Sequence, residues 1–402
     1  MTYDVAAVRS HFPALDEGAA HFDGPGGTQT PRAVAEAVAR ALTSAIANRG
    51  IVTRAERRAE DAVSHCRSAL ADLLGADPRG VVFGRSMTAL TYDLARTLAK
   101  TWQPGDEIVV TRLDHDANIR PWVQAAEAVG ALPRFADFDP TTGELAPDDI
   151  AAHLSDRTRL VAVTAASNLI GTMPDIPAIT RLVHDRTCAL VHVDGVHYTA
   201  HHSVDLPASG ADFWACSPYK FLGPHCGVLA ADPALLETLH PDKLLPATDD
   251  VPERFELGTL PYELMAGTTA AIDFLASLAG VHAGSRRDRL VAAYAEMDHH
   301  ERGLRDRLEP TLRALPGVVV HSNATRRTST TLFSVQGWDS QAIRIELAAR
   351  WINAPAGSFY ALECARHLGL GDTGAVRIGL APYTTEEEVD RLLDALRDLL
   401  LR

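Results

Sequence analysis

The middle of the chain alternates short apolar runs with helical stretches, and this alternation constrains the fold more than any other feature of the sequence. Several runs lack polar residues at every second position, which is typical of strands covered on both faces. Helices are predicted between most of them, at 87–100, 117–129, 148–153 and 177–184. The strand-like runs are VVF (81–83), EIVVT (107–111), LPRFAD (132–137), LVAVTAAS (160–167), ALVHVDG (189–195), FWACS (213–217) and GVLAAD (227–232). We therefore expect an α/β domain with a largely parallel sheet, whose ligands bind beyond the carboxyl ends of the strands.

The pattern changes after about Leu260. Strand-like VVVHS, STTLFSVQG and VRIGLA now alternate with helices predicted at 262–278, 286–315, 341–350 and 386–399. This texture indicates a smaller α+β domain. We place the large domain at 15–262, including helices at 31–48 and 54–74, and the small domain at 1–14 and 263–402. The helix at 262–278 fits either domain.

Charge and cysteine content exclude several classes of protein. The formal net charge is −14, which argues against a nucleic-acid groove or an anionic membrane surface, because both need clustered positive charge. The five cysteines are scattered and contain no C-x-x-C, so we expect reduced thiols in a cytoplasmic protein rather than disulfides or zinc. No basic start followed by an apolar run marks a secretory signal, and no apolar stretch is long enough to cross a bilayer. The His-His pairs at 201–202 and 299–300 lack a metal-binding frame, and no metal site is expected.

An aspartate and a lysine follow two of the apolar strands. ALVHVDG carries Asp194 at its end, and FWACS leads into Ser-Pro-Tyr and then Lys220. Such strand ends are a suitable place for a reactive amine with a carboxylate partner, and lysine is rarely buried without a reason. A buried ion pair is the alternative interpretation.

These residues sit among motifs that resemble the class V aminotransferase family of fold-type I pyridoxal 5′-phosphate (PLP) enzymes, and in particular its cysteine desulfurase-like subgroup. The motifs occur in the family's order along nearly the whole chain: HFDGPGGTQTP, NRGIVT, PGDEIVV, DHDANIRPW, ASNLIGT, RFELGT and VRIGLAPYTTEEEVD. The resemblance implies a fold-type I PLP-transferase, with a mostly parallel seven-stranded sheet in the large domain and a smaller α+β C-terminal domain.

The same resemblance implies roles for the residues around the cofactor. Lys220 would bind PLP covalently and move protons at the substrate Cα, and Asp194 would keep the pyridine nitrogen protonated. His197 stands where desulfurases carry a glutamine that contacts the phenolic oxygen. Asn168 would face that oxygen or the substrate carboxylate. His115 would stack on the ring and act as acid or base, with a core histidine as the alternative.

The cofactor phosphate is expected on the turn at 86–88, where a helix begins, because free amides and the helix dipole favour a dianion there. Thr259 would come from a second subunit, so the resemblance implies a homodimer. The full set of expected phosphate contacts is Met87, Thr88, Ser217, Tyr219 and Thr259.

Substrate binding is assigned by the resemblance to Arg377, whose guanidinium would grip an amino-acid carboxylate in a bidentate manner. A surface salt bridge is the alternative for Arg377. Desulfurases also need a mobile cysteine, but here Tyr360 takes its place in NAPAGSFYALECARHLGL, and Cys364 falls in a predicted helix. We therefore expect β-elimination from cysteine or a cysteine conjugate, with Lys220, His115 and Tyr360 as the candidate catalytic residues. Transamination, epimerisation and a non-catalytic scaffold are the alternatives.

Overall fold

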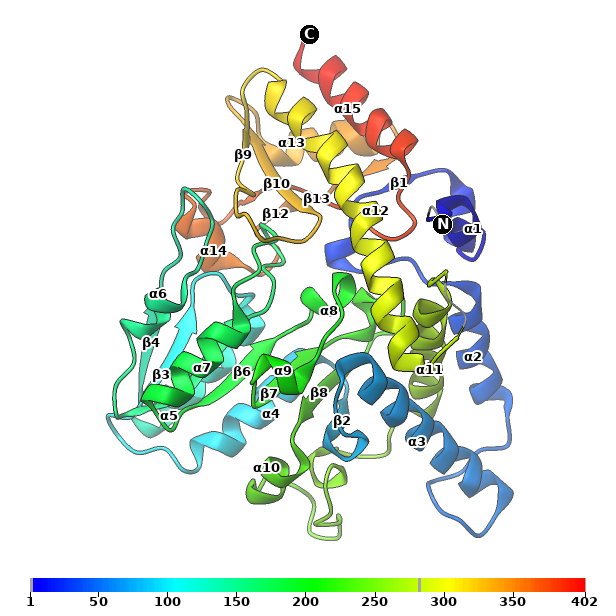
Figure 1. Cartoon of the computed structure of the whole chain (residues 1–402), viewed down its shortest axis with the longest axis vertical. Helices are drawn as coiled ribbons and strands as arrows, with labels where there is room; N and C mark the ends of the chain where they lie inside the picture. Colours follow the sequence, from blue (N-terminus) through cyan, green and yellow to red (C-terminus); the bar gives the residue numbers. More distant parts are fainter. Residues whose placement is uncertain (1–2, 281–282, 402) are drawn as a thin grey trace.

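The computed structural model describes residues 3–280 and 283–401. Its larger part is built on a seven-stranded sheet in the order β2-β8-β7-β6-β5-β3-β4 (Figure 1). β8 is antiparallel to both of its neighbours, β2 and β7. The other pairs, β7-β6, β6-β5, β5-β3 and β3-β4, are parallel. The strands are β2 (Val81–Gly84), β3 (Glu107–Thr111), β4 (Leu132–Ala136), β5 (Thr158–Thr164), β6 (Leu190–Asp194), β7 (Phe213–Cys216) and β8 (Gly227–Ala231). The predicted mostly parallel seven-stranded sheet is confirmed.

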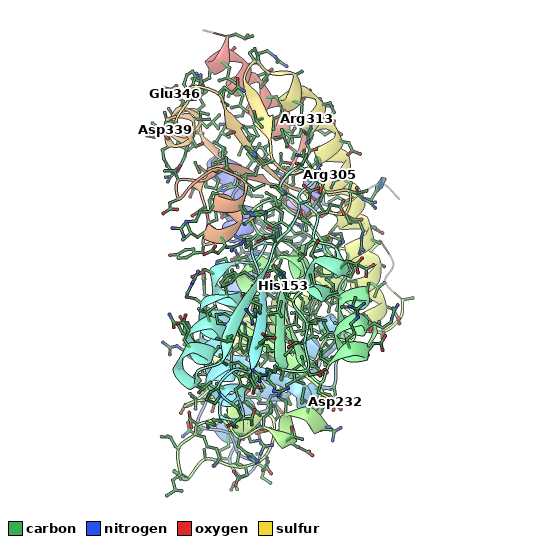
Figure 2. All side chains as sticks on the ribbon, turned by 90° about the vertical axis from the view of Figure 1, so that its left-hand side faces the viewer. His153, Asp232, Arg305, Arg313, Asp339 and Glu346 are labelled. Carbon is green, nitrogen blue, oxygen red and sulfur yellow. The ribbon has the colours of Figure 1, made fainter. Side chains whose placement is uncertain are left out.

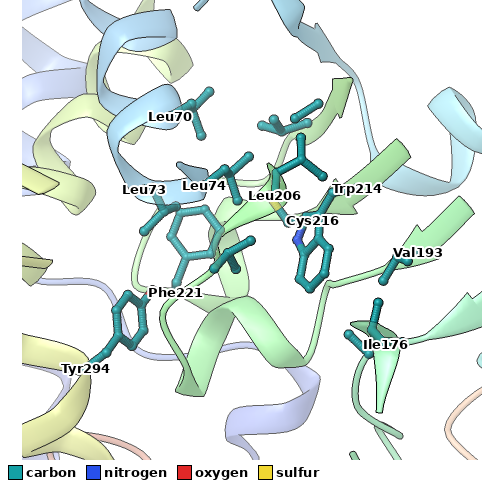
Figure 3. Packing of buried hydrophobic residues seen from close by; sticks show 14 of the residues in the cluster. Leu70, Leu73, Leu74, Ile176, Val193, Leu206, Trp214, Cys216, Phe221 and Tyr294 are labelled. Carbon is teal, nitrogen blue, oxygen red and sulfur yellow. The ribbon is translucent and has the colours of Figure 1, made fainter. Parts of the chain in front are cut away.

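Both faces of this sheet are covered, which explains the absence of polar alternation in the strands. Along β5, Val161 and Val163 belong to one buried cluster, whereas Leu160 and Ala162 belong to another. Figure 3 shows the first face, where Leu70 and Leu74 of α3 pack near Trp214 and Cys216 of β7. The main helices of this part are α2 (Arg32–Thr43), α3 (Arg54–Leu74), α4 (Met87–Ala99), α5 (Arg120–Val129), α6 (Pro147–Ala151), α7 (Ile176–Arg186), α8 (Tyr198–His201), α9 (Leu206–Ser209) and α10 (Pro233–Thr238).

Two predicted helices differ from the structure at their ends. The helix expected at 31–48 ends at Thr43, because Ser44 leaves the helical region and donates its hydroxyl back to Ala41. The helix expected at 117–129 is divided into a short 3-10 turn, Asp116–Asn118, and α5, which carries Pro121 in its first turn. Proline favours such a start because it lacks the amide hydrogen that a helix interior requires.

The smaller part contains the four-stranded sheet β12-β13-β10-β9, which is antiparallel throughout. A separate buried cluster, with Leu308, Phe333 and Leu396 among its members, forms its core. The elements are β9 (Val318–Val320), β10 (Thr330–Val335), β11 (Ile352–Asn353), β12 (Ala356–Gly357), β13 (Ala375–Gly379), α11 (Tyr262–Ser277), α12 (Arg286–Ala314), α13 (Ser340–Ala348), α14 (Leu362–His367) and α15 (Glu386–Leu400). These elements confirm the predicted α+β texture of the C-terminal region.

Helices α11 and α12 connect the two parts. α11 packs against α2 and α3, and α12 contributes Tyr294 to the core of the larger part and Leu308 to that of the smaller part. Near the N-terminus, α1 (Val5–Arg9) is followed by β1 (Ala20–His21), which pairs in parallel with β11. The division at residue 262 stays a prediction.

Charged side chains cover the outside of both parts, as the exposed Asp232, Arg313 and Asp339 show (Figure 2). None of the helices in the described ranges combines the length and apolar character that a membrane span requires.

Candidate active site

A cavity lies at the carboxyl ends of β5, β6 and β7, beside the first turn of α4. Nine of the twelve predicted site residues line it: Met87, Thr88, His115, Asn168, Asp194, His197, Ser217, Tyr219 and Lys220. Thr164 and Ser217 are far apart in sequence, but both line the cavity, because the carboxyl ends of parallel strands meet at one edge of a sheet. Arg377, Tyr360 and Thr259 do not line the cavity.

Lys220 ends the 3-10 turn Pro218–Lys220, directly after β7. Its side chain is buried, its Nζ donates to the carbonyl of Pro25, and it lies 5.0 Å from the centroid of the Tyr219 ring. Burial, with the charge of Arg377, lowers the pKa of Lys220 to about 7. A large share of this amine is therefore neutral at neutral pH, as a nucleophilic amine must be.

Asp194 is the last residue of β6 and is buried. Its Oδ1 accepts a hydrogen bond of 2.9 Å from the backbone amide of Val196. Burial raises the pKa of Asp194 to about 6, and Lys220 opposes that shift. The adjoining Gly195 has no room for a side chain, because a Cβ there would lie 2.1 Å from the Trp214 indole nitrogen. Asp194 is thus a fixed carboxylate that needs a cationic or N–H partner in the cavity.

The first turn of α4 forms the predicted phosphate site. Ser86 is the N-cap, and its hydroxyl accepts from the amide of Ala89, so the amides of Met87 and Thr88 remain free within the helix. Gly227 of β8 presses against this turn, since a Cβ there would lie 2.1 Å from the carbonyl carbon of Ser86. The close approach holds the amide-bearing turn in place.

His197 and Asn168 each direct an unpaired polar atom into buried space. The Nε2 of His197 lies near two threonine hydroxyls, but its Nδ1 has no partner among the described residues. The Oδ1 of Asn168 is also unpaired within that part of the chain, while its Nδ2 donates to the carbonyl of Phe359 at 3.0 Å. Buried polar atoms of this kind point to a missing polar ligand.

His115 is the N-cap of the 3-10 turn at 116–118, and its Nδ1 accepts from the amide of Ala117 at 3.0 Å. Burial and the nearby Lys220 charge lower the pKa of His115 to about 4. The imidazole is therefore neutral near pH 7, with its proton on Nε2.

Arg377 of β13 is buried, although it forms no ion pair within residues 3–280 and 283–401. Its Nη1 donates to the carbonyl of Asn168 at 2.8 Å, its Nε has no partner, and its guanidinium lies 3.7 Å from the centroid of the Phe359 ring. Burial lowers the pKa of Arg377, but the guanidinium stays charged. The surface salt bridge considered as an alternative is wrong, and a buried guanidinium with no direct ion pair in the described residues suits an anionic ligand.

The remaining predicted residues lie outside the cavity. Tyr360 is 77% exposed, with its ring centroid 5.6 Å from that of His115. Cys364 lies in α14 and is fully buried, and burial raises the pKa of its thiol. Thr259 is exposed on the surface of this single chain.

The sequence does not mark the individual residues Thr328 and Thr330, which contact His197, or Phe359, which covers Arg377. Their chemistry is common, so only the tertiary structure identifies them. One sequence feature does single out Lys220, because the chain has only three lysines. The other two, Lys100 and Lys243, form ion pairs with aspartates.

The geometry fits PLP. A buried amine of lowered pKa can bind the aldehyde, a carboxylate on the same cavity can pair with the ring nitrogen, and free helix amides can hold the phosphate. His197 Nδ1 and Asn168 Oδ1 are two further buried polar atoms of the cavity-lining residues without a partner in the described part of the chain.

Comparisons with known proteins agree with this geometry. Residues 20–392 match the family model for class V aminotransferases. The chain is 32% identical to the aminotransferase-like protein FGM3 of Gibberella zeae, over 99% of both chains, and 31% identical to a cysteine desulfurase of Dickeya dadantii, over 98% of this chain and 96% of that one. The crystal structure of the cysteine desulfurase CsdA from Escherichia coli is similar with a TM-score of 0.86 and 26% identity, over 100% of this chain and 99% of that one. The chain therefore belongs to the class V aminotransferase family and is a PLP-dependent, cysteine desulfurase-like enzyme.

Proposed function

We propose that this enzyme is a carbon–sulfur lyase that removes sulfur from L-cysteine or a cysteine conjugate by β-elimination. One observation carries the choice: the cavity gathers the groups for chemistry at Cα, but none of the residues that line it is a cysteine. A desulfurase of the persulfide type needs such a thiol as its nucleophile, and elimination does not.

The cysteines of the chain support this choice. Cys66, Cys216, Cys226 and Cys364 are buried. Cys188 is exposed, but it precedes β6, whereas Asp194 ends that strand. At about 3.3 Å per residue, the strand separates Cys188 from the cavity by roughly 15–20 Å. A persulfide carrier at the cavity mouth has no candidate among these side chains.

Three side chains have roles in the proposed reaction. Arg377 binds the substrate carboxylate, and Asp194 faces the ring nitrogen of the cofactor. Lys220 takes the Cα proton, which its pKa of about 7 allows near neutral pH. PLP, when bound, supplies the electron sink for the pair of electrons left on Cα. Cleavage of the Cβ–S bond then releases the sulfur, and hydrolysis gives pyruvate and ammonia.

We further infer a cytoplasmic homodimer. The five cysteines are free thiols, which suits a reducing compartment. Thr259 is exposed and lies outside this chain's cavity, as expected for a residue that contacts the cofactor phosphate of a second copy.

An absorbance and product assay tests the proposal. Purified protein with added PLP is expected to show a visible band that borohydride bleaches and that Lys220→Ala abolishes, while Lys100→Ala and Lys243→Ala keep it. Incubation with L-cysteine or a conjugate is expected to release sulfide or thiol together with an equal amount of pyruvate.

Other outcomes contradict the proposal in distinct ways. A keto acid that retains the substrate's sulfur indicates transamination, and an inverted amino acid indicates epimerisation. A persulfide on Cys364 contradicts the proposal that sulfur leaves by β-elimination without a cysteine nucleophile. Protein that stays colourless with PLP is the result expected of a non-catalytic scaffold.

A further inference from the structure

His197 is held by hydroxyl groups on only one side of its ring. Its Nε2 lies 2.9 Å from Thr330 Oγ1 and 3.1 Å from Thr328 Oγ1. Its Nδ1 is buried, has no partner in the described part of the chain, and belongs to a side chain that lines the cavity. The two nitrogens therefore have different surroundings.

The hydroxyls decide which nitrogen carries the proton. Neither threonine hydroxyl has another acceptor among residues 3–280 and 283–401, so at least one donates to Nε2. The imidazole is neutral, because burial and the surrounding His201, His202, Lys220 and Arg377 lower its pKa. A neutral imidazole has one N–H. If Nε2 accepts, the proton is on Nδ1.

The segment that supplies these hydroxyls also fixes the ring plane. Thr328 and Thr330 both contact His197, and Ser329 between them contacts another residue. Ser329 donates to Glu301 at 2.7 Å, and Glu301 is also 2.7 Å from Nδ1 of His201. The His201 ring meets the His197 ring at 74°, with centroids 4.8 Å apart.

We propose that Thr330, assisted by Thr328, is a positioning residue that holds His197 in the tautomer with its proton on Nδ1, so that His197 donates a hydrogen bond to the phenolic oxygen of PLP. The proposal deepens the function proposed above and rests on it. A glutamine amide carries N–H groups in every state, whereas a histidine presents one toward the cavity in only one tautomer. The threonine hydroxyl selects the tautomer of His197 that carries its proton on Nδ1.

Substitution of the hydroxyls tests the proposal. In Thr330→Val the nearer of the two hydroxyls is lost at nearly constant volume, so only the longer contact of Thr328, at 3.1 Å, is left to hold the proton on Nδ1. The apoprotein is titrated with PLP, and the dissociation constant and visible spectrum are measured. We expect Thr330→Val to weaken PLP binding about tenfold, in line with the loss of one hydrogen bond to a charged oxygen, and to shift the visible band. Thr330→Ser restores the hydroxyl and is expected to stay within about twofold of the wild type.

Two controls separate positioning from a general loss of structure. Thr331→Val removes the neighbouring hydroxyl, which faces the other way and donates to Glu309 at 2.8 Å, and is expected to leave both readouts unchanged. In a His197→Gln background, Thr330→Val is expected to have no effect, because glutamine needs no tautomer control.

The inference is wrong if Thr330→Val matches the wild type, if Thr331→Val has the same effect, or if the effect persists in His197→Gln. If wild-type protein gives no Lys220-dependent band with PLP, the proposed function itself is wrong. The two failures are thus distinguishable.

Discussion

Lys220 is buried and lies near the charge of Arg377, so the folded protein destabilises its ammonium form. The pKa falls from 10.5 to about 7. Between these values the unfolded chain binds more protons than the folded one, and the free energy of unfolding therefore rises with pH in this window. Below pH 7 the full cost of burying the ammonium is present. At about 1.4 kcal/mol per pH unit, that cost is on the order of a few kcal/mol.

Lys220→Met is accordingly expected to stabilise the apoprotein most at acidic pH. We expect a gain of roughly 2–4 kcal/mol in the free energy of unfolding at pH 6, which shrinks toward zero near pH 10. Urea unfolding at several pH values measures it. Lys100→Met, at an exposed ion pair with Asp242, is the control and should show no such trend. An equal effect of Lys220→Met at pH 6 and pH 10 contradicts the argument.

At this scale the sequence predicted residues that follow strands or belong to a local motif. Lys220 and Asp194 could be placed because the ends of parallel strands converge, and His197 could be placed through the family resemblance. Thr330 could not, because its contact with His197 depends on how β10 is positioned against α8, which no local pattern encodes.

Among the elements, the loop at 357–361 determines access to Arg377. Phe359 and Tyr360 both have positive φ, 51° and 58°, an unusual state for residues with side chains. The carbonyl of Tyr360 accepts from the amide of Asp116 at 2.7 Å, and that of Phe359 accepts from Asn168. These bonds hold the Phe359 ring over the guanidinium, so the loop covers the residue proposed to bind substrate.

Phe359→Ala is expected to expose Arg377 and to speed the association of glycine, an amino acid without a leaving group, with the PLP-loaded protein by several fold. The cation–π contact that is lost is worth about 1–2 kcal/mol. Stopped-flow absorbance measures the rate. Tyr360→Ala, in the same loop but with an exposed ring, is the comparison and should change it less than twofold. Slower binding in Phe359→Ala would mean that the ring orients Arg377 instead of covering it.

Element types were predictable, and their ends less so. The apolar run EIVVT and the helical stretch at 54–74 predicted β3 and α3 with their observed bounds. α2 ends where the Ser44 hydroxyl bonds to the backbone carbonyl of Ala41. This end was not predictable, because serine also occurs at positions that do not end a helix. The backbone conformation of the loop at 357–361 could not be predicted, because the positive φ of Phe359 and Tyr360 is imposed by tertiary contacts.

Over the whole molecule, α12 joins the two hydrophobic cores. Tyr294 and Leu290 pack in the core of the larger part, and Leu308 in that of the smaller one. A helix shared in this way couples the stability of both parts. Leu308→Ala is expected to cost about 2–5 kcal/mol and to lower the midpoints of tryptophan fluorescence and far-ultraviolet circular dichroism together. Val291→Ala, at an exposed position on the same helix, should cost less than about 1 kcal/mol. Separate transitions in Leu308→Ala would show that the cores unfold independently.

The parallel pairing of β1 with β11 has a consequence for synthesis on the ribosome. Residues 20–21 emerge early, yet the strand against which they pair, at 352–353, emerges more than three hundred residues later. The segment after β1 includes Pro25, whose carbonyl receives the Lys220 amine. In the nascent chain β1 therefore stays unpaired until translation is nearly complete, and the buried Lys220 acquires its final surroundings only then.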